Sequence, residues 1–262
     1  MSRLALFLSV VLFPIVTFSQ YDWSEAQLVH EGIHYSYQLC SADFDGDGDQ
    51  DLAAPDAISY GNGDFFWFEN IGNGEFTAHS IGENLASPRT AYSVDLDQDG
   101  DWDIIGSDRR VNGKLMCWEN DGTGGFTQRW IYGNHNGAER VTTGDMDGDG
   151  DLDIISTACA TNTNEDITCW ENSGEESFAM QIVESDFLYA CDVTTADIDQ
   201  DGDLDILATS GYYAGTGSVG WWENQGDNGF TQHIVEQYSP RASNPVAMDI
   251  NGDSIIDLLA SS

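Results

Sequence analysis

Basic side chains are scarce in this chain: 8 Lys and Arg stand against 46 acidic residues, for a formal net charge of −38. Nucleic acid is therefore excluded as a partner, because its phosphates require basic patches. The chain is nevertheless 40% hydrophobic and 11% aromatic, too apolar for a disordered acidic tail. A folded chain with so much like charge repels itself unless something neutralises it, and a cation is the obvious candidate.

Cysteine is also sparse, and the five cysteines are too scattered to form a disulfide framework. Cys159 and Cys169 flank a polar loop and can face each other across a hairpin. Oxidation of this pair is compatible with an exported protein, but buried free thiols are the favoured interpretation. The chain has no CxxC pair and no Cys/His spacing typical of a zinc site.

Long apolar runs are missing except at the start. Arg3 precedes an apolar stretch over residues 4–18, and Thr17 and Ser19 place small residues before a cut ahead of Gln20. This pattern predicts a signal peptide over residues 1–19 and a secreted or cell-surface protein. A transmembrane anchor fits less well, because the run is short and contains Pro14. No second apolar stretch predicts a transmembrane segment in the mature chain, residues 20–262.

An Asp-rich segment of nine residues recurs through the chain, starting at positions 43, 95, 145, 197 and 249, with spacings of 52, 50, 52 and 52 residues. We call these segments Asp loops 1 to 5 and number their positions 1 to 9. An aromatic-Glu-Asn box recurs with the same period at residues 68–70, 118–120, 170–172 and 222–224. Such regularity identifies a repeat protein.

Each period contains four short β-like stretches separated by Gly and Asn turn signals, and no stretch has a sustained helical period. Four strands in about fifty residues are typical of a propeller blade. The sequence therefore predicts an all-β fold, a β-propeller of four-stranded blades with calcium-binding loops. It has about five blades, or is a fragment of a seven-bladed propeller. A fifth blade is expected to close the ring by joining residues 27–30 and 37–42 to the last strand.

Asp at alternate positions of a tight loop can direct several carboxylates at one ion. Calcium takes six to eight oxygen ligands in flexible geometry, whereas magnesium demands a stiff octahedron, so calcium is favoured. Gly at position 6 of loops 1 to 4 permits the sharp turn. The candidate ligands are Asp43, Asp45, Asp47, Asp49 and Asp51; Asp95, Asp97, Asp99, Asp101 and Asp103; Asp145, Asp147, Asp149, Asp151 and Asp153; Asp197, Asp199, Asp201, Asp203 and Asp205; and Asp249, Asn251, Asp253, Ile255 and Asp257.

The loop is not an EF-hand, because position 12 is never Glu and the flanking residues are β-like. Position 9 is therefore the expected closing acid, and position 7 the expected donor of a backbone carbonyl. A carbonyl ligand tolerates Ile255 in the last copy.

These residues resemble the FG-GAP/VCBS repeats of integrin α-chain propellers and of many secreted bacterial proteins. The resemblance implies up to five structural calcium ions, each held by side chains at positions 1, 3, 5 and 9 and a carbonyl at position 7. Loop 5 departs from the pattern: Asn251 replaces an Asp and Ser254 replaces the Gly. Loop 5 is therefore expected to bind calcium most weakly.

Three functions remain open. A binding or adhesion module for a glycan or an extracellular protein is favoured, with Tyr60, Phe65 and the Tyr212-Tyr213 pair as candidate loop contacts. A scaffold within a longer protein is the second alternative. A carbohydrate-active lyase or dehydratase is the third, and it is disfavoured because the five His residues show no catalytic clustering. The sequence thus predicts a non-enzymatic protein.

Overall fold

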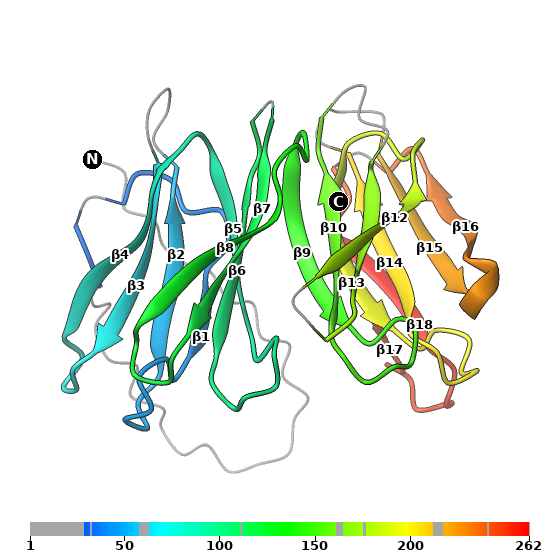
Figure 1. Cartoon of the computed structure of the whole chain (residues 1–262). Coiled ribbons are helices and arrows are strands. Elements are labelled where there is room, and N and C mark those ends of the chain that lie inside the picture. Colours follow the sequence, from blue (N-terminus) through cyan, green and yellow to red (C-terminus); the bar gives the residue numbers. More distant parts are fainter. Residues whose placement is uncertain are drawn as a thin grey trace, which may run out of the picture.

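The structure, a computed structural model, describes residues 29–31, 33–57, 63–110, 112–160, 165–174, 177–211, 217–239 and 241–261. The described chain is almost entirely β-structure (Figure 1). It forms four sheets of four strands and one sheet of two strands, and each sheet is a simple antiparallel meander. Each four-stranded sheet is one blade, which confirms the predicted all-β fold of blade-like repeats.

The strands follow the period of the sequence. Blade 1 contains β1 (Cys40–Ala42), β2 (Asp51–Asp56), β3 (Gly63–Asn70) and β4 (Phe76–Leu85). Blade 2 contains β5 (Pro88–Val94), β6 (Asp103–Asp108), β7 (Lys114–Asn120) and β8 (Phe126–Tyr132). Blade 3 contains β9 (Ala138–Gly144), β10 (Asp153–Ala158), β11 (Ile167–Asn172) and β12 (Phe178–Glu184). Blade 4 contains β13 (Ala190–Ala196), β14 (Asp205–Ser210), β15 (Ser218–Asn224) and β16 (Phe230–Gln237), with a short 3-10 turn η1 (Gly226–Asn228). The last sheet pairs β17 (Ser243–Met248) with β18 (Asp257–Ser261).

The first strands of successive sheets lie beside one another, because β5 contacts β1 and β9, and β13 contacts β9 and β17. The last strands, β4, β8, β12 and β16, are the opposite edges of their sheets. The sheets follow one another in chain order across Figure 1. This order places each blade beside the next one along the chain, so a loop at one end of a blade is close to its counterpart in the next.

The hydrophobic core lies between blades rather than within one layer. Trp118, Trp170 and Trp222, from the boxes of blades 2 to 4, are almost fully buried and belong to three separate clusters. Trp118, for example, packs against Phe65 of blade 1 and donates from its indole to the carbonyl of Ile81, at 2.7 Å. Each box tryptophan therefore packs its blade against the preceding one.

One expectation about the blades is wrong. β1 pairs with β2 and completes blade 1, whereas β17 and β18 form a separate two-stranded sheet among the described residues. Residues 37–42 therefore do not join the last strand to make a fifth blade. Residues 29 and 30 are not in a strand, and residues 27 and 28 lie outside the described part. The repeat period did not reveal this boundary, because a period can be divided into blades at more than one point.

All five cysteines are free thiols. The favoured interpretation of Cys159 and Cys169 is confirmed, because Cys169 pairs in register with Ile155 rather than with Cys159. Within the described residues, no helix is long and apolar enough to cross a membrane. The predicted signal peptide, residues 1–19, and the loop residues Tyr60, Tyr212 and Tyr213 lie outside the described part. Phe65 is buried in the core rather than presented by a loop.

Candidate functional site

The Asp loops connect the first and second strands of their sheets and lie along the lower edge of the molecule in Figure 1. In loops 1 and 3 the carboxylate at position 1 folds the loop around itself. Its Oδ2 accepts the N–H of the position-6 glycine, at 3.0 Å from Gly48 to Asp43 and 3.1 Å from Gly150 to Asp145. Both glycines have positive φ, 96° and 97°, a conformation that side chains disfavour.

The folded loops bring carboxylates together. In loops 1 to 4, one oxygen from each of three acids lies within 4.8 Å of the others. The groups are Asp43, Asp45 and Asp51; Asp95, Asp97 and Asp99; Asp145, Asp147 and Asp153; and Asp197, Asp199 and Asp205. Loop 5 forms no such group among the described residues.

Positions 1 and 3 thus converge in four loops, but positions 5 and 9 differ. Position 9 joins the group in loops 1, 3 and 4, whereas position 5 joins it only in loop 2, as Asp99. The position-7 side chains are in none of the groups, and Ile255 is 67% exposed. The prediction for position 7 concerned its backbone carbonyl.

The acid at position 9 has a second role that the sequence did not reveal. Asp103 is 2% exposed, and its two oxygens accept the N–H groups of Leu96 and Asn120, each at 2.9 Å. Leu96 belongs to the loop, and Asn120 is the last residue of the box on the third strand. The same pair of hydrogen bonds recurs in blades 1, 3 and 4. The box Asn and the position-9 Asp therefore clamp the Asp loop to its own blade.

Burial changes the acidity of these clamping residues. Desolvation raises the pKa of Asp103 and of Asp153 to about 6, opposed by the two backbone hydrogen bonds and reinforced by the neighbouring carboxylates. The raised pKa means that burial, and to a lesser degree the neighbouring carboxylates, disfavour the charged form of these two acids, and a cation bound in the loop would offset that cost.

Position 4 divides the loops into two kinds. Loops 1, 3 and 5 have Gly there, and its N–H donates to the Oδ1 of the position-1 Asp, at 2.9, 2.8 and 2.6 Å. Loops 2 and 4 have Gln98 and Gln200 instead. In these two loops, the Oδ1 atoms of Asp95 and Asp197 are buried and have no hydrogen-bond partner among the described residues. A buried carboxylate oxygen without a donor is costly unless a cation contacts it.

The box Glu adjoins the loop from the outer side. Its charge acts on the position-3 Asp in loops 1, 2 and 4, raising the pKa of Asp45, Asp97 and Asp199 together with desolvation, which is the larger cause. Glu69 and Glu223 in turn bind His79 and His233 of the outer strands, at 2.8 and 2.7 Å. His79 stacks on Trp67 and His233 on Trp221, in each case the residue just before the box.

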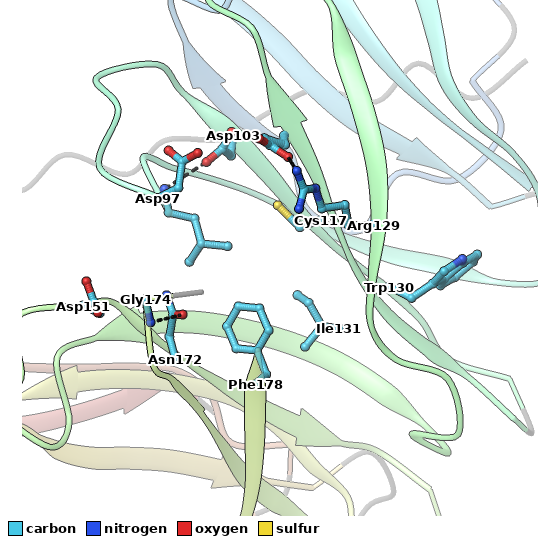
Figure 2. A pocket seen from close by; sticks show the side chains of 12 residues that line it. Asp97, Asp103, Cys117, Arg129, Trp130, Ile131, Asp151, Asn172, Gly174 and Phe178 are labelled. Carbon is cyan, nitrogen blue, oxygen red and sulfur yellow. Dashed lines mark hydrogen bonds and ion pairs between the residues drawn. The ribbon is translucent and has the colours of Figure 1, made fainter. Parts of the chain in front are cut away.

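Two equivalent grooves open beside the loops. The groove between blades 2 and 3, about 80 Å³, has Asp103, Cys117 and Arg129 on one side and Asn172, Gly174 and Phe178 on the other (Figure 2). The groove between blades 3 and 4 is larger, about 350 Å³. It is lined by Met146, Asp147, Glu171, Gln181, Asn224, Gly226 and Phe230. Only the second reaches the size of common small-molecule sites.

The structure also assembles a Ser-His-Glu relay that the sequence analysis missed. The Ser156 hydroxyl lies 3.0 Å from His135 Nε2, and His135 Nδ1 lies 3.1 Å from Glu165 Oε2. Ser156 and His135 are completely buried, and the serine hydroxyl accepts the indole N–H of Trp170. A buried hydroxyl engaged in this way has no access to substrate. The relay instead attaches the connection between blades 2 and 3 to the core of blade 3.

Fold and loops together define a class: a bladed β-repeat protein whose loops at one end carry groups of acids able to hold metal ions. Residues 43–106 and 95–156 match the model of the FG-GAP-like repeat family. The chain thus carries FG-GAP-like repeats, as its resemblance implied. A search of curated proteins found no match to this chain.

Proposed function

We propose that this chain is an extracellular module whose Asp loops hold structural calcium. The observation that carries the proposal is the convergence of three carboxylate oxygens within 4.8 Å in each of loops 1 to 4. Ligands on opposite sides of a calcium ion stand about 4.6–5.2 Å apart, so three oxygens of this spacing fit around one ion. The buried Oδ1 atoms of Asp95 and Asp197, which have no donor in the described chain, add a reason for a cation.

Calcium suits the donor set and the charge of the whole chain. All the grouped donors are carboxylate oxygens, the hard ligands that calcium prefers. Extracellular modules often bind calcium with a Kd of about 10⁻⁴–10⁻³ M, which gives lasting occupancy outside cells. Export rests on the predicted signal peptide, and its test is the mass of the secreted protein, which should begin at Gln20.

Calorimetry in EDTA and in 10 mM calcium tests the proposal. At these affinities, 10 mM calcium stabilises the folded state by about 1.4–2.7 kcal/mol per occupied loop, so the melting temperature should rise strongly. Magnesium at the same concentration should have a much smaller effect. Equal melting temperatures in EDTA and calcium would overturn the metal assignment.

A second candidate function is recognition of a glycan in the groove between blades 3 and 4. Its volume of about 350 Å³ and its polar lining, Glu171, Gln181 and Asn224 beside Phe230, combine hydrogen-bonding groups with an aromatic ring. A glycan array in calcium buffer should give binding that Gln181→Ala weakens. Gln128→Ala on the equivalent outer strand of blade 2 serves as the control. Binding unchanged by Gln181→Ala would place the ligand elsewhere, on a different surface or on an extracellular protein.

A further inference from the structure

Loops 2 and 4, which have Gln at position 4, each contact the next Asp loop through that side chain. Gln98 of loop 2 donates from Nε2 to the carbonyl of Gly150 in loop 3, at 2.7 Å, and lies 3.4 Å from Asp151 Oδ1. Gln200 of loop 4 donates in the same way to the carbonyl of Ser254 in loop 5, at 2.5 Å. Gly46 and Gly148, at position 4 of loops 1 and 3, have no side chain to make this contact.

Each bridging Gln stands between groups proposed to touch calcium. Gln98 is flanked by Asp97 and Asp99, two of the three grouped acids of loop 2. Its amide holds the peptide that joins Gly150 to Asp151, and Asp151 bears the carbonyl expected to face calcium in loop 3. An ion that orders loop 2 therefore fixes Gln98, and Gln98 fixes one ligand of loop 3.

The backbone at both bridging residues adopts a conformation that side chains disfavour. Gln98 and Gln200 have φ of 60° and 65°, in the left-handed region that favours Gly. Gly46 and Gly148 share this positive φ, at 75° and 77°, and donate to the position-1 Oδ1 of their loops, whereas in loops 2 and 4 that oxygen is buried without a donor in the described chain. The buried Oδ1 without a donor and the bridging Gln therefore occur in the same two loops, loops 2 and 4.

We infer that calcium loads the loops in coupled pairs, loop 2 with loop 3 and loop 4 with loop 5, with Gln98 and Gln200 as the positioning residues. The inference rests on the proposed binding of calcium. Binding to one loop of a pair raises the affinity of the other by a common factor, because coupling between two sites is reciprocal. Loops 3 and 4 have no such bridge, since position 4 of loop 3 is Gly148.

Glycine-selective NMR of the full chain can follow each loop separately during a calcium titration, because loops 1 to 4 each have a position-6 glycine. Asp97→Asn disables loop 2 and should raise the calcium concentration that half-saturates Gly150 of loop 3 by roughly fivefold or more, the lower range of typical coupling. In the Gln98→Gly background, the same Asp97→Asn change should leave the Gly150 midpoint unmoved.

The matched control is the unbridged pair. Asp147→Asn disables loop 3 and should leave unchanged the calcium concentration that half-saturates Gly202 of loop 4. This control shows whether the loss of one negative charge by itself weakens binding in a neighbouring loop. Asp147→Asn should raise the Gly100 midpoint of loop 2 by the same factor as the forward experiment. Gln98→Gly reproduces the residue found in loops 1 and 3, so the variant should fold. All four glycines could respond to calcium while Asp97→Asn changes the Gly150 midpoint equally in the native and the Gln98→Gly backgrounds. That result would overturn the coupling but leave calcium binding intact. Glycines that do not respond to calcium at all would overturn both.

Discussion

Asp103 illustrates how one carboxylate serves both the loop and the blade. It accepts two backbone N–H groups, from Leu96 and Asn120, while buried beside other acids. Asn at this position keeps one acceptor but turns an N–H₂ group toward the second donor. We expect Asp103→Asn to lower the free energy of unfolding by about 1 kcal/mol or more in EDTA, where calcium plays no part, because a buried N–H left without an acceptor costs about 1–3 kcal/mol and removal of the disfavoured buried charge offsets only part of that loss.

The exposed Asp99 of the same loop is the control for this change. Asp99→Asn removes the same charge from the same loop but retains the oxygen that accepts the Asp101 N–H. Its urea unfolding curve should stay within about 0.5 kcal/mol of the native protein, as surface substitutions usually do. If the two variants were equally stable, the position-9 acid would be only a ligand and not a clamp.

The free cysteines give a second prediction for single residues. Burial raises the pKa of Cys40 and Cys159 to about 12 and that of Cys191 to about 11, and it also raises the pKa of Cys117 and Cys169. The thiolate is the reactive form, so at pH 8 iodoacetamide should modify Cys40 and Cys159 roughly a thousandfold, and Cys191 roughly a hundredfold, more slowly than an exposed cysteine. Mass spectrometry should find five modified cysteines only after denaturation. A mass two units low, from a Cys159–Cys169 disulfide, would contradict the structure.

Between elements, a buried ionic cluster joins the inner strands of blades 2 and 3. Glu139 of β9 lies 3.2 Å from Arg109 Nε and 4.0 Å from Arg89 Nε, and the three side chains are 8–17% exposed. Desolvation raises the pKa of Glu139, and the two arginines oppose the rise. Glu139→Gln should lower the free energy of unfolding by about 3–5 kcal/mol, because it leaves buried arginines without their counter-charge.

The exposed Glu119–Arg129 pair within blade 2 provides the comparison. Its side chains are 27% and 46% exposed. Arg129→Gln should therefore cost less than about 1 kcal/mol, since solvent screens exposed ion pairs. Equal losses for the two variants in thermal or urea unfolding would mean that the Glu139 cluster contributes packing alone.

The scale of elements also shows what the sequence could predict. Local signals sufficed to predict the strands, because turn residues separate neighbouring strands and the aromatic-Glu-Asn box lies on the third strand of each blade. The division into blades was not local: β1 pairs with β2, and the repeat period is the same whether a blade begins before or after the strand that precedes each Asp loop. The convergence of positions 1 and 3 followed from the Asp spacing. The clamp by Asn120 and the bridge from Gln98 did not, because they join residues 17 and 52 positions apart.

At the scale of the whole molecule, charge repulsion opposes folding and attracts calcium. The five Asp loops hold half of the 46 acidic residues, and they lie at one end of the blades, so repulsion is concentrated there. Salt screens this repulsion, since the Debye length falls from about 30 Å at 0.01 M to about 8 Å at 0.15 M. Sodium chloride should thus stabilise the calcium-free protein.

The same screening should weaken calcium binding, because part of the attraction comes from acids beyond the ligand shell. Raising sodium chloride from 0.01 to 0.15 M should increase the melting temperature in EDTA and reduce the further increase produced by 2 mM calcium. Calorimetry at both salt concentrations, with and without calcium, measures the two effects in one set of samples. A melting temperature in EDTA that did not respond to salt would show that the loop acids do not limit stability. In that case the calcium would act through the loop ligands alone, and its effect would be independent of ionic strength.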